Sequence, residues 1–256
     1  MPEALIALAL LLYAAAALRA LRPAGGAPRL EPTWFGAAVA VHTLALAARW
    51  AAHGQGPFTT LHEILSSSLW SLSLVLLLGL WRLPELRRAA LWALPVLALL
   101  AAWLLASDPR RGHLPATFDT SLLYLHAVVG KAYLGLLLAA AALGLAAGRR
   151  QPLHEALRFD RLAHRFAAWA FVCDTLMLIV GAVWAQDAWG RWWAWDPLES
   201  WAFASWLALA ASLHARATLR PAPGRHGLWL AGCFVLAFLT FFGVPFVSTS
   251  PHKGAI

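Results

Sequence analysis

Residues 121–147 read SLLYLHAVVGKAYLGLLLAAAALGLAA, an apolar run of 27 residues in which Lys131 is the one Lys, Arg, Asp or Glu. As a helix rising ~1.5 Å per residue, this run is ~40 Å long and exceeds the ~30 Å hydrocarbon core of a bilayer. The whole chain has the same character, since 61% of its 256 residues are hydrophobic and 12% are charged, with a mean hydropathy of +0.65. This composition excludes a soluble globular domain and predicts a polytopic membrane protein.

Seven further apolar runs are long enough to cross the membrane, so we predict eight transmembrane helices, at approximately 4–21, 34–52, 63–81, 89–106, 121–147, 167–185, 201–219 and 228–247. No shift in composition marks a second domain. The predicted fold class is therefore an all-α membrane protein, a polytopic bundle of about eight transmembrane helices in a single domain over residues 1–256. The charged stretch 153–165 predicts a short interfacial helix before the sixth span.

Basic residues cluster at alternate loops. Fourteen of the 20 Lys and Arg lie at or near the loops that follow the first, third, fifth and seventh predicted helices. The positive-inside rule assigns these loops to the cytoplasmic side, so both termini and the segment 184–201 are predicted to be extracytoplasmic. The net charge of +8 reports this topology, and no nucleic-acid partner is predicted.

The segment 184–201 is exceptionally rich in tryptophan. Seven of the chain's 15 tryptophans fall between Trp184 and Trp206. Indoles offer wide apolar area with few torsions to freeze, and such a cluster can form a surface for a large planar ligand such as porphyrin. If the segment is helical, Trp189, Trp192 and Trp193 share one face. Trp195 belongs to the same predicted surface. The alternative is an ordinary interfacial belt of indoles.

Two charged features flank these tryptophans. Asp196, followed by Pro197 and with Glu199 three positions on, has the pattern of a capping box that begins the seventh predicted helix. This structural role is favoured over direct catalysis, although a cap can orient the tryptophans. Arg191 is a candidate partner for carboxylates of the ligand, because guanidinium geometry suits them.

Four of the ten histidines have positions that favour a role as iron ligands. His126, near the outer end of the fifth span, and His252, just after the last span, flank the tryptophan-rich segment. His42 and His214 lie in the inner half of the membrane. Two imidazoles on opposite faces can ligate haem iron, so two pairs at two depths predict an inner and an outer haem site.

The alternative for each of these histidines is a hydrogen bond to a neighbouring helix, and for His42 both interpretations stay open. The other six histidines, His53, His62, His113, His154, His164 and His226, are expected to be solvated in loops. Cys173 and Cys233 lie inside predicted spans without a Cys-x-x-Cys spacing, which excludes thiol-disulfide exchange.

The motif Trp-Gly-x-x-Trp-x-Trp-Asp-Pro-x-Glu-Ser-Trp at 189–201 resembles the tryptophan-rich signature of the haem-handling proteins of cytochrome c maturation, specifically the CcsA (ResC) family of System II. The segment 49–63 is similar to that family's connection between the second and third spans, although Thr60-Leu61-His62-Glu63 replaces the usual Asn-Leu-Tyr-Glu. By position, His126 and His252 match the family's external haem ligands. His214 matches a histidine in a span, and His42 is the candidate for its partner.

The resemblance implies a membrane subunit of a cytochrome c synthase in a bacterial-type inner (cytoplasmic) membrane. Such a subunit transports haem b to the outer face and presents it for thioether attachment to the Cys-x-x-Cys-His motif of apocytochrome c. It also implies a separate CcsB (ResB)-like partner. The catalytic residues are not identified, since the sequence offers no obvious general base. Two other functions stay open: a haem chaperone or exporter without synthase activity, and a bis-histidine membrane redox cytochrome.

Overall fold

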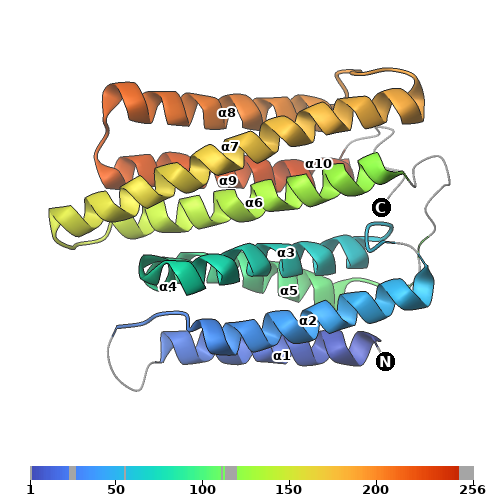
Figure 1. Cartoon of the computed structure of the whole chain (residues 1–256), viewed down its shortest axis with the longest axis horizontal. Helices are drawn as coiled ribbons and strands as arrows, with labels where there is room; N and C mark the ends of the chain where they lie inside the picture. The colour runs from blue at the N-terminus through green and yellow to red at the C-terminus, as the bar shows by residue number, and fades with distance from the viewer. Residues whose placement is uncertain (1, 23–26, 55, 111, 113–119, 248–256) are drawn as a thin grey trace. The chain divides into compact units, whose positions relative to one another are not determined.

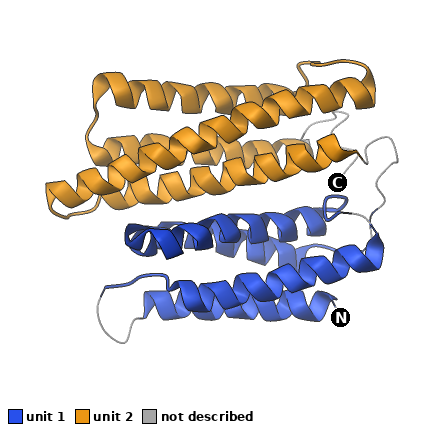
Figure 2. Cartoon of the chain, in the orientation of Figure 1, with its two compact units in different colours: residues 1–113 blue, residues 114–256 orange. Residues whose placement is uncertain are grey.

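The computed structural model describes residues 2–22, 27–54, 56–110, 112 and 120–247, and every regular element in these ranges is a helix (Figure 1). The predicted all-α class is thereby confirmed. Contacts within the chain divide it into two compact units, residues 1–113 and residues 114–256 (Figure 2). The single domain predicted over residues 1–256 stays a prediction.

The first unit contains α1 (Pro2–Leu21), α2 (Pro32–His53), α3 (Leu61–Arg82), α4 (Pro84–Ala89), the short 3-10 helix η1 (Ala90–Trp92) and α5 (Leu94–Ala106). Helix α1 packs along α2, and α3 packs against α2 and α5. The sequence predicted one helix over 89–106, but α4 and η1 are inclined by 55° to α5. The break lies just before Pro95, which has no N–H to donate and whose ring clashes with the carbonyl four residues earlier.

A polar network ties together three helix ends of the first unit. Arg49 of α2 is only 3% exposed. Its Nε donates to Glu63 Oε1 (3.1 Å) and its Nη1 to Glu3 Oε1 (2.5 Å). Glu63 Oε2 accepts a further bond from Thr59 Oγ1 (2.6 Å). Buried charges persist only when paired and hydrogen-bonded, so this network fixes the start of α1, the end of α2 and the start of α3.

The second unit contains α6 (Ser121–Ala147), α7 (Leu153–Trp189), α8 (Pro197–Leu219), α9 (Pro223–Phe242) and the short α10 (Val244–Val247). Helix α6 packs against α7 and α9, and α8 packs against α9 and α7. The buried residues of α6 include the small side chains of Ala139, Ala140, Ala141, Ala142 and Gly144. Small residues let helices approach closely where no water is present to drive their association.

Helix α7 differs from its prediction. The sequence suggested a short interfacial helix over 153–165 and a separate span over 167–185, but the structure has one helix of 37 residues. The stretch 153–180 contains no Pro or Gly that would end a helix. Asp160, in the polar part of this helix, is only 1% exposed and is bonded to α8 and α9. The charged stretch therefore packs within the unit.

All eight predicted spans correspond to helices, and their apolar character supports a multi-pass membrane protein. Six helices of the described part are long and apolar enough to cross a bilayer, or seven if the bent pair formed by α4–η1 and α5 counts as one span. The remaining long helix, α8, has 23 residues and carries Glu199, His214 and Arg216 among its apolar residues. The predicted orientation of the termini stays a prediction.

Candidate functional site

The tryptophan-rich segment 184–201 runs from the end of α7 through a loop, residues 190–196, into the start of α8; this tryptophan-rich loop separates the two helices. Helix α7 ends at Trp189. The next residue, Gly190, adopts a left-handed conformation (φ 73°), which costs glycine little because it has no Cβ. Residues 190–196 are not helical. The predicted common helical face for Trp189, Trp192 and Trp193 is therefore wrong, because the glycine cap ends the helix before Trp192.

The predicted capping box at the start of α8 is confirmed. Asp196 Oδ1 accepts the Glu199 N–H (2.9 Å), and Glu199 Oε2 accepts the Asp196 N–H (3.3 Å). The same Oε2 also accepts the Ala194 N–H (2.7 Å). Glu199 therefore holds the residues on both sides of Trp195, which has an unusual positive φ of 57°. A left-handed conformation costs a non-glycine residue ~1–2 kcal/mol, so these bonds help to retain it.

Several indoles of the tryptophan-rich segment contact one another edge to face. Trp184 and Trp189 have ring centroids 4.9 Å apart at 72°, and Trp193 and Trp195 have centroids 5.7 Å apart at 84°. Edge-to-face pairs are favourable because the positive ring edge meets the negative ring face. Trp192 and Trp195 stay 57% and 67% exposed. The segment thus combines indoles that are paired edge to face with indoles whose surface stays exposed.

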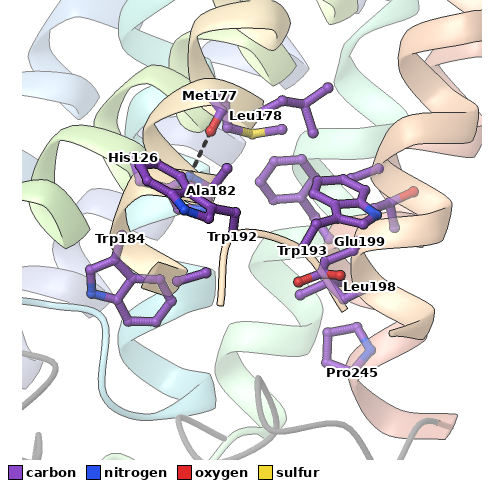
Figure 3. Close-up of a pocket in the computed structure, with 15 residues that line it drawn as sticks. His126, Met177, Leu178, Ala182, Trp184, Trp192, Trp193, Leu198, Glu199 and Pro245 are labelled. Atoms are coloured by element: carbon purple, nitrogen blue, oxygen red, sulfur yellow. Dashed lines mark hydrogen bonds between the residues drawn. The ribbon is translucent and has the colours of Figure 1, made fainter. Parts of the chain in front are cut away.

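A cavity of about 210 Å³ lies beside this loop (Figure 3). It is lined by His126 of α6, by α7 from Met177 to Ala185, by Trp192 and Trp193, by the first turns of α8 including Glu199, and by Thr240, Phe241 and Pro245. By comparison, a cavity that holds a single water has a volume of only ~10–15 Å³, so this cavity has room for part of an organic ligand. The lining is mainly apolar, as in ligand pockets generally.

His126 is the histidine that the structure brings to the tryptophan-rich loop. Its Nδ1 lies 3.0 Å from the main-chain oxygen of Met177 (Figure 3). A carbonyl oxygen can only accept, so Nδ1 carries the proton and Nε2 carries the lone pair. A neutral imidazole of this tautomer can ligate a metal through Nε2.

The other predicted site residues are less closely gathered. Trp189, Trp195, Asp196 and Arg191 belong to or border the loop, but they are not among the residues that line the cavity. Arg191 is exposed. His252 lies outside the described residues.

His42 and His214 lie in different units. His42 is fully buried in the first unit, and its Nε2 is 3.0 Å from Ser66 Oγ of α3. This contact fits the alternative that the sequence left open, a hydrogen bond between helices. His214 is exposed on α8. Their role as an inner pair of iron ligands stays a prediction.

Within the described ranges, no group of three or more His, Cys, Asp or Glu side chains is placed to hold a metal ion.

Sequence reasoning missed several buried polar groups. His62 and His226 are 5% and 0% exposed, so their predicted solvation in loops is wrong. His226 Nδ1 lies 2.6 Å from Asp160 Oδ1, and Arg216 Nη2 donates to Asp160 Oδ2 (2.6 Å). His226 falls in the first turns of α9 because Pro223 begins that helix earlier than expected. A helix start at Pro223 was the signal that could have revealed it.

Asp174 of α7 is a second buried group that went unnoticed. It is 0% exposed, as is Tyr133 of α6. Its carboxylate makes no well-aligned hydrogen bond to the described residues, although the Tyr133 hydroxyl lies near enough to interact with it. The sequence contains a signal for this buried group: Asp174 lies inside the predicted span 167–185, and acidic residues are rare in hydrocarbon.

Comparisons with known proteins relate the chain to a protein family. The family model for cytochrome c assembly proteins matches residues 59–252. Cytochrome c biogenesis protein CcsA of Prochlorococcus marinus is 43% identical over 94 residues, which are 37% of this chain and 30% of the relative. CcsA of Gloeobacter violaceus is 42% identical over 106 residues, 41% of this chain and 30% of the relative. The chain thus matches less than a third of the length of these relatives.

The fold is also found in a solved structure. Cytochrome c Heme Lyase CcmF is similar with a TM-score of 0.66 over 94% of this chain and 46% of that chain, at 20% sequence identity. At this identity the likeness concerns the fold alone. The family model covers more than half of the chain and includes α3 to α9. This protein therefore belongs to the cytochrome c assembly protein family.

Proposed function

We propose that this protein is the membrane subunit of a cytochrome c synthase, which transports haem b to the outer face of a bacterial-type inner membrane and presents it to apocytochrome c. One observation carries the proposal: His126 lines the same cavity as Trp192 and Trp193 of the tryptophan-rich loop. Family membership supports a role in cytochrome c maturation. The named relatives are cytochrome c biogenesis proteins.

In this proposal His126 is an axial ligand of the haem iron. The bond from Nδ1 to the Met177 oxygen (3.0 Å) leaves the lone pair on Nε2, which is the atom that would bind iron. The indoles of Trp192 and Trp193 would cover porphyrin surface and exclude water. His252 is proposed as the second outer ligand, and His42 with His214 as the inner pair, on the resemblance of the sequence alone.

The chain contributes positioning to the attachment reaction. Each thioether forms when a cysteine thiol of the apocytochrome adds across a haem vinyl group: the S–C bond forms, the vinyl π bond breaks, and the thiol proton goes to the other vinyl carbon. No oxidant is consumed. Glu199 lines the cavity, but its Oε2 already accepts two main-chain N–H groups. It therefore holds the loop, and proximity and orientation are the main contribution of this chain.

A second membrane protein of the CcsB/ResB type is the proposed partner, together with apocytochrome c. The same resemblance that suggests the synthase role implies this partner. Copurification with such a protein checks the assignment. Transport would begin on the cytoplasmic side, where the proposed inner pair lies.

An absorption spectrum tests the outer site. Protein purified with its partner from haem-replete cells should show a low-spin bis-histidine spectrum. His126→Gly should weaken this spectrum, and added imidazole should restore it by entering the space of the lost ring. His154→Gly is the matched control, because His154 is exposed at the opposite end of α7. An unchanged spectrum in His126→Gly would refute the proposal.

Coexpression distinguishes a synthase from a carrier. The protein, its partner and a c-type apocytochrome are produced in a host without its own maturation system. Covalent holocytochrome, detected by haem stain after denaturing electrophoresis, supports the synthase role. Bound haem without covalent product instead supports a haem chaperone. Reversible redox potentials for two stable haems would favour a membrane redox cytochrome.

A further inference from the structure

We propose that Gly181 of α7 is a positioning residue, which lets the main chain of α7 select the iron-binding nitrogen of His126. This inference rests on the proposed function, because it explains how the ligand of that site is held. Two independent observations point to it. One is a hydrogen bond, and the other is the absence of a side chain at the point of closest approach between the ring and the helix.

The hydrogen bond determines the tautomer of the imidazole. His126 Nδ1 lies 3.0 Å from the Met177 oxygen, and that oxygen has no proton to give. The ring must therefore donate through Nδ1 and keep its lone pair on Nε2. Metal-binding histidines commonly use such a second bond to fix the ring orientation and raise the basicity of the ligating nitrogen. Here the main chain supplies it, so no side-chain partner is needed.

Position 181 controls access to that oxygen. The carbonyl of residue 177 and residue 181 belong to the same helical turn, and every Cβ of a helix tilts toward the N-terminus. A Cβ at position 181 would lie 2.9 Å from both Cε1 and Nδ1 of His126. Real Cβ atoms essentially never come this close to other heavy atoms. The ring therefore occupies the space that any side chain at 181 would take.

The ring cannot yield without cost. It lies between α6, which carries it, and α7, and these two helices share the most extensive contact of the second unit. A shift away from α7 would lengthen the Nδ1 bond beyond the ~3.2 Å at which such bonds are effective. The same shift would rotate Nε2 relative to the cavity. Glycine at 181 thus serves both the geometry and the tautomer of the ligand.

Gly181→Ala tests this inference in the complex with the partner. Loss of the orienting bond should weaken haem binding by about 10- to 100-fold, the usual effect of removing such a partner. Added imidazole should restore the low-spin spectrum less fully than in His126→Gly, because the displaced ring still occupies part of the space. Gly232→Ala in α9 is the matched control, because a Cβ there has no heavy atom within 4 Å. The control should bind haem like the unchanged protein.

The double variant separates positioning from general packing. In a His126→Gly background with imidazole, Gly181→Ala should have little further effect, since free imidazole is not attached to α6 and can shift away from the added Cβ. Additive losses that imidazole does not restore would show a packing defect and overturn the inference. A normal spectrum for Gly181→Ala, with an altered one for His126→Gly, would overturn the inference and leave the proposed function standing. If neither variant alters the spectrum, the proposed function itself fails.

A measurement on the unaltered chain keeps the inference testable if Gly181→Ala does not fold. Nitrogen-15 NMR of labelled histidine in the haem-free complex should show His126 protonated at Nδ1 and bare at Nε2. The opposite tautomer would overturn the role of the Met177 carbonyl. His126→Gly identifies the signal by its disappearance.

Discussion

Replacing Glu199 by alanine should disorder the tryptophan-rich loop without removing an indole. Glu199 Oε2 accepts the N–H groups of Ala194 (2.7 Å) and Asp196 (3.3 Å), one on each side of Trp195. Trp195 has a φ of 57°, which costs ~1–2 kcal/mol for a residue with a side chain. The variant loses the contacts that offset this cost.

The size of the effect follows from these bonds. Hydrogen bonds to a charged group contribute ~1.5–3 kcal/mol, and we take this range for the whole clamp because Glu199 is partly exposed. If the ordered loop is the form that binds haem, its reduced population lowers the apparent affinity in proportion. At ~1.4 kcal/mol per factor of ten, Glu199→Ala should weaken haem binding by about 10- to 150-fold. Glu199→Gln keeps a neutral acceptor and should weaken binding by less.

Haem titration of the purified complex, followed by tryptophan quenching, measures this loss. Asp196→Ala should also weaken haem binding, because Asp196 caps the same helix. Asp196 does not line the cavity, so this loss would not come from a missing contact with the ligand. Asp196→Ser, which retains a cap, should remain near normal. Glu31→Ala is a control, since Glu31 pairs with exposed Arg29 in the other unit. If Glu199→Ala binds haem with an affinity within twofold of that of the unchanged protein, the proposed role of Glu199 in holding the loop is refuted.

Three further changes test other parts of the structure. Asp160→Asn should lower the free energy of unfolding in detergent by about 3 kcal/mol, since it leaves Arg216 and His226 beside a weakened partner. A loss below about 1 kcal/mol would contradict the importance of this buried network. Ser66→Ala should cost about 1 kcal/mol through its bond to His42. An altered haem spectrum in this variant would support His42 as one of the proposed inner ligands, and an unchanged one would leave its bond to Ser66 as its role. Trp193→Ala should reduce haem content at unchanged helicity by circular dichroism, and equal content would make this indole part of an interfacial belt.

Local signals in the sequence predicted the elements well. The apolar runs gave the helices because a bilayer-spanning helix must be long and apolar wherever it occurs. The capping box at Asp196 and Glu199 was also predictable, since both bonds join residues three apart. The predictions failed where a residue distant in sequence but close in space decides whether a side chain is buried. His226 is buried because Asp160, 66 positions earlier, accepts its N–H.

The sequence by itself determined that this chain is helical and suited to a membrane, and it named candidate haem ligands, because apolar length, helix caps and imidazole chemistry are properties of single segments. Only the tertiary structure decided that His126 meets Trp192 and Trp193 at one cavity while His42 bonds Ser66 in another unit. It also revealed why position 181 carries no side chain. These outcomes depend on how closely two helices pack, and close packing is set by side chains distant in sequence that occupy the same space.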